Sequence, residues 1–198
     1  MSLSDDLIHL KDENLSPESW YLRTSSILSK TTLRRPLAVG VFQDQSVEEI
    51  NAIISQCGLD LVQLHGEEQA DDIDKISVPC VKVIHVPLEM TGAESLVENI
   101  QDKIVSFAGR AIAIILDTSI RGDRSGGTGI TFDWKLAENV DFPVILAGGL
   151  TPENAVDALK VKGIVGLDVS SGVEFPGKPG IKDHQRIESF ISKRKREQ

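Results

Sequence analysis

Three apolar runs decide the fold that this sequence predicts: IAIIL at residues 112–116, VILA at 144–147 and IVGL at 164–167. Each run is short, bounded by turn residues and apolar throughout, which is typical of a strand buried on both faces of a parallel sheet. The polar and glycine-rich residues that follow the runs are Asp117-Thr118, Gly148-Gly149-Leu150 and residues 168–172. Because barrels of alternating strands and helices assemble their sites from the C-terminal strand ends, we expect these residues to lie together.

The same alternation extends toward the N-terminus. Further strands are predicted at residues 37–42, 61–66 and 81–86. Helices are predicted at residues 47–57, 67–76, 93–103, 132–139, 152–160 and 184–193. Strands that alternate with helices predict an α/β fold with a parallel sheet and right-handed crossovers. The count gives about six βα units, so a (βα)8 barrel would be N-terminally incomplete.

The remaining segments define the predicted domain organisation. Residues 1–34 are interpreted as an acidic, polar tail followed by a helix that begins at Ser16-Pro17-Glu18 and runs to about residue 29. Residues 35–192 form the barrel-like domain. Residues 193–198 are interpreted as a charged tail, because a solvated helix end is a commoner explanation of such a basic run than a targeting signal.

Composition restricts the possible partners. The chain has 198 residues and a formal net charge of -9, which argues against nucleic acid or an acidic membrane as a general partner. No apolar run approaches membrane-spanning length, and the N-terminus lacks the basic start of a signal peptide. Two cysteines, Cys57 and Cys80, make no disulfide framework, and both lie at the wrong ends of their elements for catalysis. We therefore predict a cytoplasmic protein with two structural cysteines.

Asp117 is the strongest catalytic candidate. It follows five apolar residues, and apolar surroundings could raise the pKa of its carboxyl group enough for a general acid. The alternative is that Asp117 only caps the next turn. Beyond it, Gly126-Gly127-Thr128-Gly129 could present backbone N–H groups to an oxyanion, although a mobile loop can have the same composition.

The glycines after the last two strands predict a phosphate site. Gly148 and Gly149 let the backbone approach a ligand, and Thr151 followed by Pro152 predicts a helix N-terminus that would face an anion. A second glycine turn, at Ser170-Ser171-Gly172, follows one unit later. A tight turn without a ligand is the alternative, but the pair of turns favours a phosphorylated small molecule.

Asp168 and His65 each have two possible roles. Asp168 ends the last strand, where it could bind sugar hydroxyls or brace a loop. His65, in Gln63-Leu64-His65-Gly66, could act on a substrate, although a buried histidine held by hydrogen bonds is the more usual case.

Six motifs, in this order, resemble phosphoribosylanthranilate isomerase, most closely its fungal forms. They are VGVF at 39–42, VQLHGE at 62–67, LDT at 116–118, GGTG at 126–129, LAGGLTPEN at 146–154 and GLDVSSGVE at 166–174. The resemblance implies a (βα)8 barrel of tryptophan biosynthesis. It also implies an Amadori rearrangement of N-(5-phosphoribosyl)anthranilate to the carboxyphenylamino deoxyribulose phosphate, without cofactor or metal.

By this resemblance Asp117 protonates the ribose ring oxygen and so opens the ring to a Schiff base. The backbone of Gly148, Gly149, Ser171 and Gly172 would hold the phosphate, while Gly127 and Thr128 would close over the substrate.

The sequence departs from the family at its start. The family's first strand carries a Lys-(Ile/Val)-Cys-Gly motif whose cysteine is the general base, and an arginine follows its second strand. Neither strand is found here. The leading interpretation is an incomplete form of the isomerase, whose activity the missing base would compromise. Its open barrel edges also predict self-association. The alternatives are a non-catalytic phosphosugar-binding or interaction protein and another phosphate-binding barrel enzyme.

Overall fold

The computed structural model describes residues 3, 7, 10, 13–87, 93–119 and 133–194. These residues form two compact units. The first contains Met1–Ile84 and Gln101–Ile114, and the second contains His85–Ile100 and Ile115–Gln198. Strands β3 (Cys80–Pro87) and β4 (Ala111–Ser119) each contribute residues to both units.

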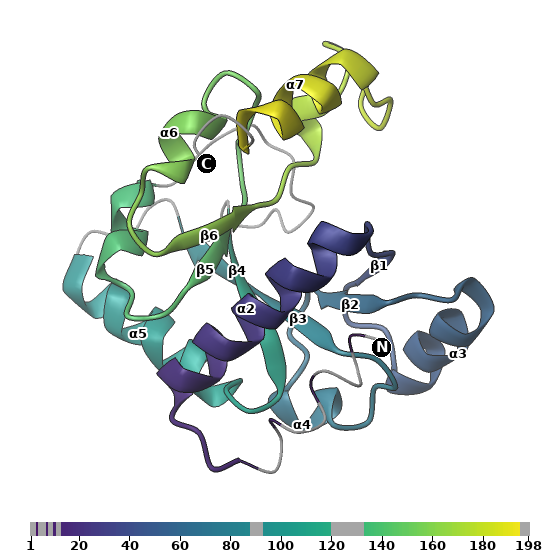
Figure 1. Cartoon of the computed structure of the whole chain (residues 1–198), viewed down its shortest axis with the longest axis vertical. Helices are drawn as coiled ribbons and strands as arrows, with labels where there is room; N and C mark the ends of the chain where they lie inside the picture. The colour runs from purple at the N-terminus through teal and green to yellow at the C-terminus, as the bar shows by residue number, and fades with distance from the viewer. Residues whose placement is uncertain are drawn as a thin grey trace. The chain divides into compact units, whose positions relative to one another are not determined.

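The strands form a parallel sheet in the order β1-β2-β3-β4-β5-β6, as the alternation of strands and helices predicts (Figure 1). The other strands are β1 (Val39–Phe42), β2 (Leu61–Leu64), β5 (Val144–Leu146) and β6 (Ile164–Leu167). The prediction of six strands in six βα units is therefore confirmed for the described part of the chain. Parallel strands in sequence order direct all of their C-terminal ends to the same edge.

The helices are mostly those that the sequence predicts. Their bounds are α2 (Pro17–Arg34), α3 (Val47–Cys57), α4 (Ala70–Ile73), α5 (Ala93–Ser106), α6 (Ala155–Leu159) and α7 (His184–Arg194), with 3-10 turns η1 (Trp134–Asn139) and η2 (Ser171–Val173). Helix α3 matches its predicted bounds because both ends are encoded locally. Ser46 and Glu49 form a capping box, and Gly58 adopts the left-handed conformation (φ 64°) at the C-cap.

The first unit uses α2 as a cover for its strands (Figure 1). The Trp20 indole N–H donates to the carbonyl of Ala111 at 2.7 Å, and the Tyr21 hydroxyl donates to the carbonyl of Ile104 at 2.9 Å. Both side chains are buried, so their polar tips are satisfied inside the unit. The helix begins at its predicted N-cap, Ser16, but runs five residues further than predicted, to Arg34.

The interpretation of the first residues as a polar tail needs correction. Leu3, Leu7 and Leu10 are helical and buried. Their spacing of four and three residues is that of one helix face, so the signal was present in the sequence but was obscured by the acidic residues between them.

Burial on both faces holds for β4 and fails for β6. All described side chains of β4 are buried, but Val165 in β6 is 46% exposed. The same is true of β1, where Val39 and Val41 are 44% and 62% exposed. Both strands lie at the ends of the sheet order, where one side lacks a neighbouring strand among those described.

Two predicted helices are shorter or tighter than expected. Only Ala70–Ile73 of the predicted segment 67–76 is α-helical, and the segment 132–139 becomes the 3-10 turn Trp134–Asn139. Among the described residues, none of the helices has the length and apolar character needed to cross a membrane.

Candidate active site

The second unit brings the side chains of Asp117 and His85 together. Asp117 lies in β4 and His85 lies in the neighbouring strand β3, and a ring nitrogen of His85 is within 4.8 Å of a carboxylate oxygen of Asp117. The prediction that Asp117 follows its strand is wrong, because β4 continues to Ser119. Asp117 and Thr118 are each only 8% exposed, so the polar residues near the C-terminal end of β4 are buried. A buried carboxyl beside an imidazole is suited to proton transfer.

The loop after β5 touches the end of β4. Gly148 and Gly149 both have positive φ angles, 83° and 63°, which favour glycine. A Cβ atom at Gly148 would overlap the side chain and backbone nitrogen of Thr118. A side chain at this position would therefore force the loop away from the strand that carries Asp117.

The predicted helix start at Thr151 and Pro152 is wrong. Helix α6 begins at Ala155, with Asn154 as its N-cap. Asn154 instead holds the loop, because its side chain accepts from the Thr151 N–H at 2.8 Å and donates to the Gly149 carbonyl at 3.0 Å. A helix of one turn has little dipole, so the loop backbone rather than a helix N-terminus is available to an anion.

The turn after β6 packs directly on the loop after β5. A Cβ atom at Gly172 would overlap the carbonyl of Leu150. Within the residues that the structure describes, the backbone N–H groups of Gly149, Ser171 and Gly172 have no acceptor. Two adjacent turns with such N–H groups are the kind of concavity that binds phosphate.

Two cations from the C-terminal segment hold the turn. The Lys182 ammonium donates to the Ser170 carbonyl at 2.9 Å and pairs with Glu174 at 2.8 Å. The Arg186 guanidinium donates to the Gly172 carbonyl at 3.0 Å and pairs with Glu153 at 3.0 Å. A trans peptide directs its C=O and N–H groups to opposite sides, so the bond to the Ser170 carbonyl fixes the direction of the Ser171 N–H.

Asp168 follows β6 directly and is a second acidic group in this unit. Burial raises the pKa of its carboxyl above the ordinary value, and the negative charge of Asp117 raises it further, while the Lys182 ammonium acts in the opposite direction. Two carboxyl groups that sense each other favour a state in which one of them keeps a proton.

The other predicted residues belong to the first unit or lie outside the described residues. His65 follows β2 in the first unit and is half-buried. Cys57 ends α3 and is exposed, and Cys80 begins β3 and is buried. Gly127 and Thr128 lie outside the described residues.

Sequence reasoning missed His85, Lys182 and Arg186. A histidine near the end of a predicted strand was a usable signal for His85, because the neighbouring strand carries Asp117. Nothing local marks Lys182 and Arg186, whose partners Ser170, Gly172 and Glu153 lie 12 to 33 residues away.

Comparison with known proteins identifies the family. The family model described as "N-(5'phosphoribosyl)anthranilate (PRA) isomerase" matches residues 5–193. The chain is 40% identical to the tryptophan biosynthesis protein TRP1 of Phytophthora nicotianae, covering 96% of this chain but 35% of that protein. It is 41% identical to the N-(5'-phosphoribosyl)anthranilate isomerase of Dehalococcoides mccartyi, covering 80% of this chain and 71% of that enzyme.

Solved structures agree with this match. The isomerase of Pyrococcus furiosus aligns with a TM-score of 0.66 at 26% identity, covering 88% of this chain and 80% of that one. A second isomerase was solved with reduced 1-(o-carboxyphenylamino)-1-deoxyribulose 5-phosphate. It aligns with a TM-score of 0.59 at 30% identity, covering 91% of this chain and 80% of that one. This chain belongs to the N-(5'-phosphoribosyl)anthranilate isomerase family.

Proposed function

We propose that this chain acts on N-(5'-phosphoribosyl)anthranilate in tryptophan biosynthesis and rearranges it to 1-(2-carboxyphenylamino)-1-deoxyribulose 5-phosphate. The observation that carries the proposal is the convergence, in one unit, of buried Asp117 with two glycine turns whose N–H groups suit a phosphate. A phosphosugar held at the turns would extend toward the acid at the end of β4.

The phosphate would bind the backbone of Gly148, Gly149, Ser171 and Gly172. Bonds from Lys182 and Arg186 to the Ser170 and Gly172 carbonyls support this role, because they hold the turn in one conformation before the ligand arrives. Lys182 and Arg186 are positioning residues in this proposal, since they contact the turn.

Asp117 would give its proton to the ribose ring oxygen. The bond between the anomeric carbon and that oxygen breaks, and the anthranilate nitrogen supplies the electron pair that forms the Schiff base. Loss of the C2 proton then gives an enol amine, which tautomerises to the ketose. The electron count is unchanged throughout, so the reaction requires no oxidant or reductant.

The C2 proton requires a base, and this sequence contains no Lys-(Ile/Val)-Cys-Gly motif. We propose His85 as the first residue to test in this role, because its imidazole lies within 4.8 Å of the Asp117 carboxylate. The ring nitrogens of an imidazole can accept a proton and return it, as this role requires. Asp168 would bind the sugar hydroxyls, and Gly127 and Thr128 would cover the substrate.

The remaining proposals concern the whole chain. Residues 35–192 would form the catalytic domain, preceded by a helical segment at 1–34 and followed by a charged tail at 193–198. The cytoplasm would be its location. Exposed Val39 and Val41 on β1, an end strand of the sheet order, support self-association through this edge.

The first experiment is complementation. The chain is expressed in a host that lacks the isomerase, and growth is measured without tryptophan. Growth that is lost in the Asp117→Asn variant supports the proposed reaction. Failure to grow, with a folded protein that still binds the reduced product, would instead identify a non-catalytic phosphosugar-binding protein.

A further inference from the structure

The loop after β5, residues 148–150, contains two consecutive glycines. Gly148 and Gly149 have φ angles of 83° and 63°, and both are half-buried. Glycine loses more conformational freedom on ordering than any other residue. A ligand that has to order such a loop binds more weakly than one that meets the loop already ordered. A contact that fixes this loop in advance would therefore strengthen the binding of phosphate.

Asn154 makes such a contact through both ends of its amide group. The Nδ2 group donates to the Gly149 carbonyl at 3.0 Å, and the Oδ1 atom accepts from the Thr151 N–H at 2.8 Å. These bonds hold the peptide groups on both sides of Leu150, and each peptide group is planar, so its orientation is fixed as a whole. The Thr151 N–H is thereby used, whereas the Gly149 N–H has no acceptor among the described residues.

The other neighbours of this loop limit its position but do not orient its peptide groups. A Cβ atom at Gly148 would overlap Thr118, and the Leu150 carbonyl lies where a Cβ atom at Gly172 would lie. Such packing contacts have little directional preference, whereas a hydrogen bond depends strongly on its angle. Within the part of the chain that the structure describes, the bond from Asn154 is the only hydrogen bond that reaches this loop.

We infer that Asn154 is a positioning residue for the phosphate of the substrate. It orders the loop so that the Gly149 N–H is presented to the ligand, and it does not contact the ligand itself. The inference rests on the proposed phosphate site. It differs from the roles of Lys182 and Arg186, which bond to the turn after β6. The alternative is an asparagine that only stabilises the fold, and the affinity for phosphate distinguishes the two.

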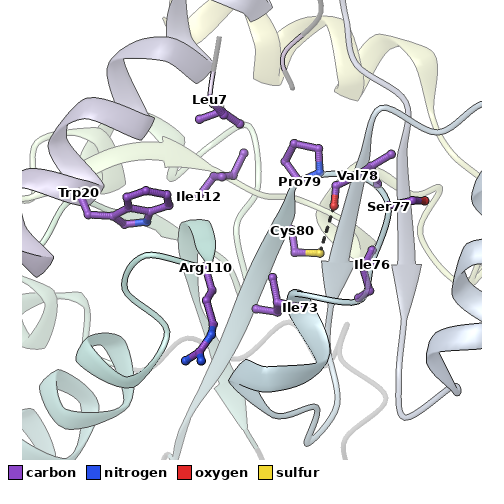
Figure 2. Close-up of a pocket in the computed structure, with 10 residues that line it drawn as sticks. All are labelled: Leu7, Trp20, Ile73, Ile76, Ser77, Val78, Pro79, Cys80, Arg110 and Ile112. Carbon is purple, nitrogen blue, oxygen red and sulfur yellow. Dashed lines mark hydrogen bonds between the residues drawn. The ribbon is translucent and has the colours of Figure 1, made fainter. Parts of the chain in front are cut away.

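Asn51 provides a matched control in the first unit. Its amide group makes the same pair of bonds, because it donates to the Lys75 carbonyl at 2.9 Å and accepts from the Ser77 N–H at 2.9 Å. Ser77 lines a cavity beside Trp20, and no residue of the proposed phosphate site lines that cavity (Figure 2). Removing either asparagine side chain therefore breaks two neutral hydrogen bonds, but only one of them holds a loop of the phosphate site.

The test is calorimetric titration of the full chain with inorganic phosphate. Asn154→Ala should weaken phosphate binding about three- to tenfold, the factor expected for one neutral hydrogen bond. Asn51→Ala should bind phosphate as the wild type does, although the unfolding temperatures of the two variants should fall by similar amounts. In an active enzyme Asn154→Ala should raise KM more than it lowers kcat, because the acid Asp117 is held in β4.

Two results would overturn this inference alone. Equal phosphate affinity in Asn154→Ala and the wild type would leave Asn154 with a structural role only, and equal weakening in Asn51→Ala would attribute the loss to general destabilisation. A wild type that binds no phosphate would overturn the proposed phosphate site as well, so the two failures are distinguishable.

A second variant covers the case in which Asn154→Ala does not fold. Asn154→Gln keeps a neutral amide but displaces it by one methylene, so the bonds to Gly149 and Thr151 cannot both keep their present geometry. Asn154→Gln should weaken phosphate binding to a similar extent. Full affinity in this variant would overturn the assignment.

Discussion

At the scale of single residues, Asp117 combines burial with a basic neighbour. It is 8% exposed and lies within 4.8 Å of a His85 ring nitrogen. Asn has the same shape and cannot supply the proton, so Asp117→Asn should lower turnover by about 10²–10⁴-fold. The substitution should leave unchanged both the unfolding temperature and binding of the reduced product. Steady-state kinetics and calorimetric titration measure these quantities, and turnover near the wild-type rate would remove Asp117 from the role of acid.

Asp168 predicts a pH dependence of stability. Its folded-state pKa is raised above 3.8 by burial and by Asp117, so folding takes up a proton at this position. The wild type therefore loses stability as the pH rises from about 4 through the folded-state pKa. Asp168→Asn should be more stable than the wild type at neutral pH, and the difference should vanish below about pH 4.

Urea unfolding across this pH range measures the effect. An Asp168→Asn variant that is less stable than the wild type at neutral pH would show that the carboxylate makes a net favourable contact in the fold. In that case the pKa of Asp168 would be lowered rather than raised.

At the scale of elements, α7 and the segment before it fix the turn after β6. Removing either cation should loosen the turn, Lys182 at the Ser170 carbonyl and Arg186 at the Gly172 carbonyl, without touching the ligand. Lys182→Gln and Arg186→Gln should each weaken the binding of inorganic phosphate about tenfold, which corresponds to the roughly 1.4 kcal/mol of one charged hydrogen bond. In an active enzyme KM should rise more than kcat falls.

Lys160→Gln is the matched control for this prediction. It removes the same charge from the exposed ion pair with Asp157 on α6. Equal weakening of phosphate binding by all three substitutions would mean that net charge matters and that position does not. Arg186→Lys, which can still reach the Gly172 carbonyl, should recover part of the affinity.

A buried ion pair joins the segment after β2 to β3 in the first unit. Lys82 and Glu68 are each 6% exposed, and the ammonium lies 2.7 Å from the carboxylate. Glu68 also accepts from the Asp44 N–H at 2.9 Å, so the pair holds the loop after β1 as well. Lys82→Met would leave a buried carboxylate unpaired, and should cost about 3–5 kcal/mol of unfolding free energy.

Lys75→Met is the control for Lys82→Met. It breaks an exposed pair with Asp72 and should change the unfolding free energy by only about 0–1 kcal/mol. Urea unfolding measures the unfolding free energy of both variants. If the two variants lose similar amounts, burial of the Lys82–Glu68 pair does not explain its contribution to stability.

At the scale of the whole molecule, the proposed self-association would use the end strand β1. Val41 is 62% exposed on this strand, and Val41→Lys should shift the protein toward monomer because charge opposes edge pairing. Val105→Lys, on helix α5 and 45% exposed before substitution, should have no such effect. Sedimentation over a range of concentrations measures both. A wild type that is monomeric at all concentrations would exclude this association.

Much of the fold could be predicted from local patterns. Runs of apolar residues bounded by turn residues located six strands, and a capping box with Gly58 located both ends of α3. Glycines marked the two turns because positive φ at Gly148 and backbone contact at Gly172 exclude side chains. The incorrect predictions concern features that depend on contacts with other parts of the chain. Val165 is exposed because β6 ends the sheet order, and α6 starts at Ala155 because Asn154 bonds to Gly149.

The sequence by itself determined the order of strands, the position of Asp117 near a strand end and the two glycine turns, because these depend on residues close together in the chain. Only the tertiary structure decided which charges meet. The bond from Arg186 to Gly172 spans 14 residues and its pair with Glu153 spans 33, and His85 and Asp117 come within 4.8 Å from two neighbouring strands. Such contacts depend on how separate elements pack, so no local pattern encodes them.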